Sequence, residues 1–128
     1  MKVETHGALN PELCGRPVEL GPGRAVVEME ASVAMSADER GLVHGGFLFG
    51  LADHAAMLAV NHPNVVLASA DVRFMKAVLV GDTLRAEAFL KGEERLNRTV
   101  EVVIRRGQDP VLSGTFSCRV PERHVLEP

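Results

Sequence analysis

The tripeptide His44-Gly45-Gly46 has the residue types that leave backbone amides open to a ligand. It directly precedes a long apolar segment, residues 47–60, whose Ala, Leu and Met content favours helix. The first N–H groups of a helix have no partner within the helix, and the helix dipole is positive there. Such an end can bind a carbonyl oxygen or an oxyanion, and glycine lets the ligand come close. Taken alone, the tripeptide is a weak signal, and a loop that needs conformational freedom is its more common interpretation.

A second candidate, Asp53, lies inside the same apolar segment between leucines and alanines. Burying a carboxylate in such surroundings is costly unless the group is paired or used. Burial would raise its pKa and suit it to proton transfer. The alternative is a position where the helix meets water or another subunit. His54 follows directly, and we interpret it as a packing or hydrogen-bonding residue because adjacent helix positions face different directions.

Ser69, Asp71 and Arg73 form a third polar group, on the strand that the pattern predicts after the helix. Alternate residues of a strand point to the same side, so the three share one face. That face is either part of a site or the polar outer face of an edge strand.

The spacing of Gly45 and Asp53 restricts how they can act together. They are eight residues apart, which is about 12 Å along a helix axis at about 1.5 Å per residue. A carbonyl held at Gly45 cannot also lie within about 3–3.5 Å of Asp53 on the same helix. If both act on one carbonyl, they come from different subunits, and a twofold dimer holds two composite sites.

The rest of the chain predicts strands. Residues 24–35 alternate between apolar and polar, and further strands are predicted at 65–76, 83–91, 97–106 and 111–120. Turns are predicted at 80–82, 92–96 and 107–110, and Pro63 ends the helix. A helix that is apolar on nearly all sides must be enclosed. We therefore expect an α+β protein of the hot-dog fold, in which a curved antiparallel sheet wraps around one central helix.

Length and composition exclude several classes. The 128 residues predict one domain over 1–128, with a core at about 16–120 and loosely ordered ends. No apolar run reaches the roughly 20 residues that cross a bilayer, and no signal peptide is evident. A net charge of −3 without Trp or Tyr argues against nucleic-acid binding. Cys14 and Cys118 have no metal-site spacing, so we expect no metal or redox cofactor and a cytoplasmic location.

The segment from His44 to Asp53 resembles the signature of the hot-dog acyl-CoA thioesterases of the phenylacetic-acid-degradation type. That signature joins His-Gly-Gly to an Asp nine positions after the His, and the joint match is specific. The resemblance implies that the Gly45 N–H polarises the thioester carbonyl. It implies that Asp53 of the partner subunit acts as general base or nucleophile, that His44 helps to hold the thioester, and that Ser69 helps to place the water.

The same resemblance implies a set of substrate-binding residues. The family usually has Asn six residues before the His, where this chain has Asp38, which cannot donate a hydrogen bond when ionised. This departure puts the role of residue 38 in doubt. Basic side chains are expected to meet the CoA phosphates. The candidate binding residues are Gly46, Asp38, Phe47, Arg73, Lys76 and, for phosphate, Arg40.

We therefore expect a thioesterase that acts on acyl-CoA, or on acyl-carrier-protein thioesters, with no cofactor beyond the CoA of the substrate. A homodimer is the expected minimal unit and a dimer of dimers the expected assembly. The alternative is a non-catalytic acyl-CoA-binding or sensing domain. Residues 68–74, 81–82 and 111–116 resemble the hot-dog effector domain of the malonyl-CoA-sensing repressor of bacterial fatty-acid synthesis. A hydratase or dehydratase ranks last, and the sequence does not identify the acyl group.

Overall fold

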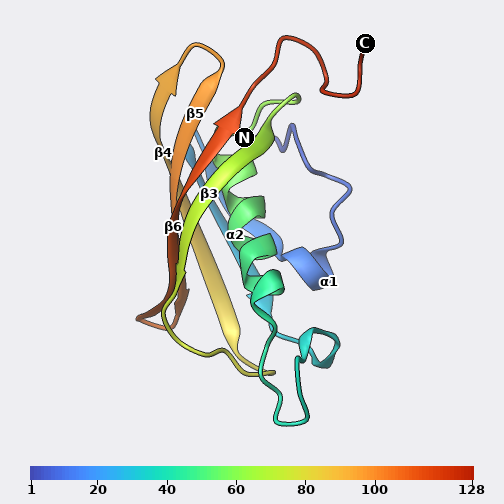
Figure 1. Cartoon of the computed structure of the whole chain (residues 1–128), viewed down its shortest axis with the longest axis vertical. Helices are drawn as coiled ribbons and strands as arrows, with labels where there is room; N and C mark the ends of the chain where they lie inside the picture. Colours follow the sequence, from blue (N-terminus) through green and yellow to red (C-terminus); the bar gives the residue numbers. More distant parts are fainter.

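The computed structural model describes all residues, Met1–Pro128. Its strands form one six-stranded antiparallel sheet that curves around a single long helix, as expected for the hot-dog fold (Figure 1). The sheet order is β1-β2-β4-β5-β6-β3. The strands are β1 (Arg16–Gly21), β2 (Arg24–Glu30), β3 (Val66–Phe74), β4 (Thr83–Glu94), β5 (Asn97–Arg106) and β6 (Asp109–Arg119). The helices are α1 (Pro11–Cys14), the 3₁₀ helix η1 (Val33–Met35) and α2 (Gly45–Val60).

Helix α2 is the centre of the core. It begins two residues earlier than predicted, with His44 as its N-cap, and it ends where Asn61 adopts a left-handed conformation. Most of its side chains are buried against the alternating inner residues of the sheet, such as Leu84, Ala86 and Ile104. The prediction that this helix is enclosed is confirmed only in part, because Gly46 is exposed and Phe49, Gly50 and Asp53 are only half-buried. Neither α2 nor any other helix is long and apolar enough to span a membrane.

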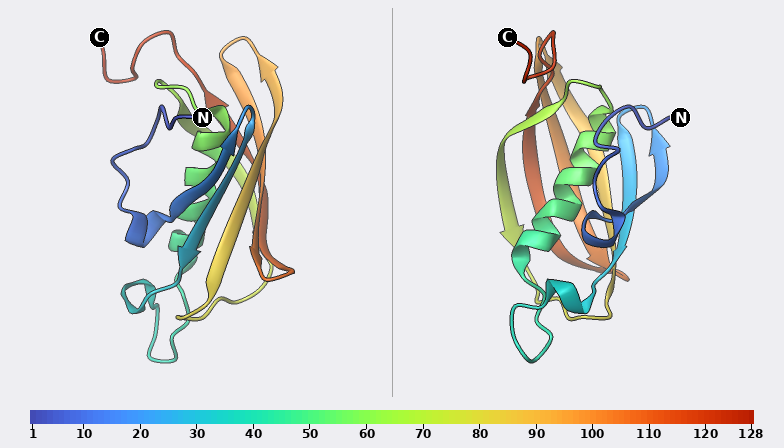
Figure 2. Two further views of the ribbon diagram at one scale, coloured as in Figure 1. Left: turned by 180° about the vertical axis from the view of Figure 1, so that it is seen from behind. Right: turned by 90° about the vertical axis from the view of Figure 1, so that its right-hand side faces the viewer.

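Residues 1–15 cover one side of α2, and they contain α1, for which the sequence analysis predicted no regular structure (Figure 2, right). Asn10 caps α1 through its side chain, which accepts from the N–H of Glu12. Asn61, at the end of α2, accepts from the N–H of Glu4 and donates to the carbonyl of Lys2, both at 2.9 Å. The same view shows no segment crossing α2 on the side of β3.

One predicted strand is wrong in its extent. Residues 24–35 were expected to form a single strand, but β2 stops at Glu30 and η1 follows. β2 ends here because its partner strand begins here: Glu30 pairs with Thr83, the first residue of β4. The next N–H, that of Ala31, donates to the carbonyl of Asp82 instead.

The connection between β3 and β4, residues 75–82, crosses from an edge of the sheet to its interior and is called the crossover below. β3 pairs with β6, so β5 and β6 lie between the two strands that the crossover joins. The crossover passes the N-terminal end of α2 (Figure 1). Arg106 holds it by donating to the carbonyl of Ala77 at 2.9 Å and to Asp82 at 3.0 Å. Strand alternation did not predict this order.

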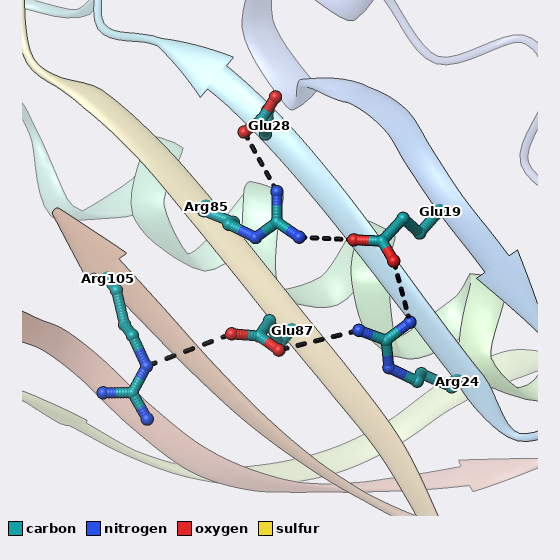
Figure 3. A network of polar contacts seen from close by, with 6 residues as sticks. All are labelled: Glu19, Arg24, Glu28, Arg85, Glu87 and Arg105. Carbon is teal, nitrogen blue, oxygen red and sulfur yellow. Dashed lines mark hydrogen bonds and ion pairs between the residues drawn. The ribbon is translucent and has the colours of Figure 1, made fainter. Parts of the chain in front are cut away.

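The outer face of the sheet over β1, β2, β4 and β5 is charged. Its side chains form a network in which each Arg meets one or two carboxylates (Figure 3). Two arginines in this network lower the pKa of Glu19 below its usual value, first by hydrogen bonding and then by charge. These exposed pairs add little stability, because water and salt screen them. The network consists of Glu19, Arg24, Glu28, Arg85, Glu87 and Arg105.

Candidate active site

The N-terminus of α2 presents two unused hydrogen-bond donors. Its N-cap, His44, makes no side-chain capping bond, and the first helical amide with an acceptor is that of Phe47, which donates to the carbonyl of His44 at 3.1 Å. The N–H groups of Gly45 and Gly46 donate to no atom of the chain. Together with the positive end of the helix dipole, they form a place where a carbonyl oxygen can gain negative charge.

This helix end is held in position from both sides. The N–H of His44 donates to the carbonyl of Met35 at 2.9 Å, and the N–H of Val43 donates to the carbonyl of Val78 in the crossover at 2.8 Å. Asp38 lies in the preceding loop and accepts from the N–H groups of Arg40 and Leu42, at 2.9 and 3.1 Å. The structure therefore gives the Asp38 carboxylate a local role, that of shaping its own loop.

Two rings stand beside the glycines. A Cβ added to Gly45 would lie 3.3 Å from the ring of Phe74, and one added to Gly46 would lie 3.1 Å from the ring of His44. The His44 ring also meets Phe47 edge-on, with centroids 6.2 Å apart. Glycine at these positions leaves room for the rings and for a ligand at the amides.

An apolar pocket of about 320 Å³ opens beside Gly45, and we call it the α2 pocket. One wall comes from Leu42, Val43 and Leu48, and the other from the end of β3 and the crossover. Phe74, Met75 and Leu42 remain partly exposed there. The remaining lining residues are Lys76, Ala77 and Val78.

Asp53 has an unusual environment for a carboxylate. Its Oδ1 is buried and has no hydrogen-bond partner in the chain. Burial raises the pKa of Asp53 above its usual value, and the adjacent His54 opposes this only in part. A group of this kind either finds its partner outside the chain or serves as a base.

The position of Asp53 follows from its helical neighbour. Phe49, one turn earlier and on the same face of α2, packs on Phe116 of β6 with ring centroids 5.5 Å apart. Asp53 therefore faces β6 and the edge strand β3, the side of α2 that no segment crosses. Burial, and then the charge of Asp53, raise the pKa of the buried Cys118 thiol of β6 to about 11.

His54 points elsewhere, as the sequence analysis expected. It is buried, and its Nδ1 lies 2.9 Å from the carbonyl oxygen of Cys14. Because a carbonyl only accepts, Nδ1 carries the proton in this bond. His54 thus packs against the N-terminal segment and takes no part in the site at Asp53.

Ser69 and Arg73 are not brought to the site. Ser69 pairs with Ser117, which is exposed between the inward-facing Phe116 and Cys118. Directly paired residues point to the same face, so Ser69 lies on the outer face of the sheet, away from Asp53. The expected role of Ser69 in placing water has no support in this geometry, and the outer-face interpretation is favoured. Arg73 pairs with Ser113 on that same face.

The remaining candidate cations are exposed. Lys76 stands at the rim of the α2 pocket, 3.6 Å from Asp109, and Arg40 lies in the loop before α2. Sequence reasoning missed Phe74 and Cys118 as neighbours of Gly45 and Asp53. Both contacts join residues far apart in the chain, and no local pattern signals them.

The curved sheet around one central helix defines the class of a hot-dog domain. The chain belongs to the thioesterase superfamily, whose family model matches residues 40–113.

Two solved structures place it further. The protein PH1136 from Pyrococcus horikoshii is 49% identical, with a TM-score of 0.98, covering 99% of this chain and 98% of that one. A mutant of the phenylacetic acid degradation protein PaaI from Thermus thermophilus is 29% identical, with a TM-score of 0.78, covering 85% and 95%. The chain is thus a hot-dog protein of the PaaI type.

Two curated relatives are longer than this chain. It is 47% identical over 116 residues to a methylthioribose-1-phosphate isomerase from Aquifex aeolicus, which covers 91% of this chain and 25% of the relative. It is 29% identical over 107 residues to the transcription factor FapR of a Geobacillus species, covering 82% and 54%. The chain spans about half or less of the length of either relative.

Proposed function

We propose that this protein is a thioesterase that hydrolyses acyl-CoA thioesters, or the equivalent acyl-carrier-protein thioesters, to the free acid and the thiol. The observation that carries this proposal is the pairing, on one helix, of two unused amides at the N-terminus with a buried, unpartnered carboxylate farther along. The similarity to PaaI supports the same conclusion.

The reaction begins at the helix end. The thioester carbonyl accepts a hydrogen bond from the Gly45 N–H, and the developing oxyanion is stabilised by this amide and the helix dipole. His44 and Gly46 border the thioester on the other side. A single oxyanion donor of this kind is worth about 3–4 kcal/mol of barrier lowering.

Asp53 of the second subunit supplies the other half of the chemistry. Its carboxylate either takes a proton from water, which then attacks the carbonyl carbon, or attacks that carbon itself to give an anhydride that water hydrolyses. In either route the carbon–sulfur bond breaks and the thiolate leaves. A thiolate is a good leaving group, so no strong general acid is needed. No cofactor is required beyond the CoA of the substrate.

The homodimer that this requires suits the uncovered side of α2. A Cβ at Gly50 would have nothing within 4 Å, and β3 is an unpaired edge next to this helix face. A second copy placed by a twofold axis would cover Asp53 and bring it towards the partner's Gly45. Two such dimers would form the expected tetramer. Lys76 and Arg40 are then the cations best placed for the CoA phosphates, and two free cysteines suit a cytoplasmic location.

Thiol release from a panel of acyl-CoAs tests the activity, and two variants test the roles. Asp53→Asn keeps the shape of the side chain but removes the base. Gly45→Pro removes the N–H and adds a ring while the helix is retained, because proline is favoured at the first helical position. His44 already has φ −65° and ψ 132°, the conformation that residues before proline adopt. We expect each to lower kcat by at least 100-fold, whereas Gly45→Ala, which adds the same Cβ but keeps the N–H, loses far less.

Mixing the two inactive variants tests the composite site. In an equal mixture of exchanging dimers half are hybrids, each with one intact site, so activity returns to about a quarter of the wild-type value. The control mixes either variant with the double variant, which can form no intact site. Activity that stays absent in every mixture would place both groups in the same subunit and contradict the composite arrangement. Full turnover by Asp53→Asn would contradict the mechanism.

The second candidate is a non-catalytic acyl-CoA-sensing domain. The similarity to a transcription factor, which covers 82% of this chain, supports a non-catalytic role. It predicts saturable binding of an acyl-CoA with no thiol release from any member of the panel.

A further inference from the structure

We propose that the α2 pocket binds an apolar acyl chain of up to about ten carbons, and that Ala77 in the crossover sets the length it accepts. This inference rests on the proposed function, since it places the thioester carbonyl at Gly45. It names the substrate class that the proposed function leaves open.

The lining of the pocket decides the chemistry of its occupant. Seven of the nine residues that line the α2 pocket are hydrophobic. Two other pockets of comparable size, on the outer face of the sheet and at its β4–β5 end, each have only two hydrophobic lining residues among eight and ten. Apolar side chains left in water at one concave place are typical of a ligand site.

The pocket is also joined to the reacting carbonyl. Gly45 lies in its wall, and the Phe74 ring lies against Gly45, 3.3 Å from where a Cβ would be. An acyl group whose carbonyl oxygen is held by the Gly45 N–H would therefore pass its first carbons alongside the Phe74 ring. The pocket continues from there between Leu48 and Val78.

The far wall is rigid enough to select a length. The backbone of Val78 accepts from Val43 at 2.8 Å, and that of Val80 donates to Gly41 at 2.9 Å. Arg106 fixes Ala77 through its carbonyl at 2.9 Å. Because these bonds join the crossover to the loop before α2 and to β5, the wall cannot move outward without breaking several of them.

The volume indicates how much of an acyl chain the pocket walls can contact. A water-sized group occupies about 30 Å³, so about 320 Å³ has room for roughly ten methylene-sized groups. Lys76 is half exposed at the rim and lies near Asp109, outside the apolar interior. The one charged residue of the lining, Lys76, already has the Asp109 carboxylate 3.6 Å away, so an acyl carboxylate would have to compete with it.

The experiment compares kcat/KM for acetyl-, hexanoyl-, decanoyl- and hexadecanoyl-CoA. Each methylene buried is worth about 0.8 kcal/mol, which converts to at most about a fourfold rise in kcat/KM. We expect kcat/KM to rise from acetyl to decanoyl and to rise no further with hexadecanoyl.

Two variants test the residues. Ala77→Phe fills the pocket from an exposed position, so the fold tolerates it, and its carbonyl bond to Arg106 is unchanged. We expect it to lower the decanoyl-to-acetyl ratio of kcat/KM at least tenfold. Phe74→Ala removes the ring that lies alongside the first carbons and should lower kcat/KM for all four acyl-CoAs. Phe89→Ala is the matched control, because Phe89 is a partly exposed phenylalanine of β4 that packs against Arg24 and Lys91.

The outcomes separate this inference from the proposed function. Equal kcat/KM for all four acyl-CoAs, or an equal loss of kcat/KM for all four in Ala77→Phe, would overturn the inference. Neither result would contradict the proposed thioesterase activity. If no thioester is hydrolysed, the proposed function fails. Equilibrium dissociation constants of acyl-CoA and CoA then test whether the pocket binds the acyl chain. Decanoyl-CoA binding tighter than CoA, with the difference removed by Ala77→Phe, would support it. Equal affinities would overturn it.

Discussion

The imidazole of His54 donates through Nδ1 to the carbonyl oxygen of Cys14 over 2.9 Å, joining the middle of α2 to the end of α1. Burial lowers the pKa of His54 below its usual value, and it also lowers that of His6, whose ring lies near Thr5 in the same N-terminal segment. The neutral form of His54 therefore belongs to the folded protein, and the N-terminal segment is attached to α2 through a group that acid would charge.

The first prediction concerns pH. Below about pH 6.5, His54 is protonated in the unfolded chain but stays neutral in the folded protein until the pH reaches its lowered pKa. The free energy of unfolding therefore falls as the pH falls from about 6.5 towards that pKa. We expect urea unfolding to show lower stability at pH 5 than at pH 7.5, with a smaller difference in His54→Gln. His124→Gln, in the exposed tail, is the control. An unchanged pH slope in His54→Gln would show that other groups cause it.

The second prediction is that Asp53→Asn gains stability as it loses activity. The raised pKa of Asp53 means that the folded protein favours the protonated carboxyl, a contribution present at low pH and lost as pH rises through that pKa. At pH 7 the ionised carboxylate therefore lowers the free energy of unfolding. We expect Asp53→Asn to raise this free energy by about 1 kcal/mol. Glu101→Gln, an exposed carboxylate of β5 outside the site, should change neither quantity. A loss of stability in Asp53→Asn would show that the carboxylate is already paired.

The third prediction uses a close backbone approach. Gly15 has φ +86°, and a Cβ there would lie 2.8 Å from the carbonyl of Glu28, from Leu51 and from Val27. Gly15→Ala should cost about 2–4 kcal/mol by overpacking and backbone strain together. Gly107→Ala is the control: its φ is +62°, but nothing lies within 4 Å of the added atom, so strain alone should cost about 1 kcal/mol. An equal loss of stability in both variants would mean that the residues around Gly15 shift at little cost to make room for the Cβ.

The fourth prediction tests the dimer. A Cβ added at Gly50 meets nothing within 4 Å in one chain, and leucine is a better helix former than glycine. Gly50→Leu should therefore fold at least as well as the wild type while weakening self-association at least tenfold, as measured by sedimentation. Thioester hydrolysis should fall with the loss of dimer. A variant that stays dimeric and active would show that the second copy binds elsewhere.

Much of the fold could be predicted from the alternation of apolar and polar residues and from the residues that end helices and form turns. The apolar run after Gly46 and the stop at Pro63 predicted α2, and the alternation around Leu84 and Val102 predicted inward-facing strands. Alternation assigns a face but not a neighbour, so the pairing of β3 with β6 could not be foreseen. The end of β2 is fixed by where its partner begins, which is a tertiary fact.

The site was predicted in the same uneven way. Gly45 and Asp53 stood out because a glycine at a helix start and a carboxylate in an apolar helix are each chemically unusual. Ser69 was correctly grouped with Asp71 and Arg73, but only the register with β6 shows that their shared face is the outer one. The contact of Phe74 with Gly45 depends on the curvature of the sheet, which residue types do not encode locally.

The crossover has a consequence for how this fold can diverge. Residues 75–82 belong to no strand, and they supply one wall of the α2 pocket while Arg106 and Asp82 anchor their backbone. Replacements at Met75, Lys76 or Ala77 alter that wall and leave the packing around α2 intact. Substitutions at these exposed positions can therefore change which acyl groups the pocket accepts during evolution. They avoid the destabilisation that substitutions in the buried core cause.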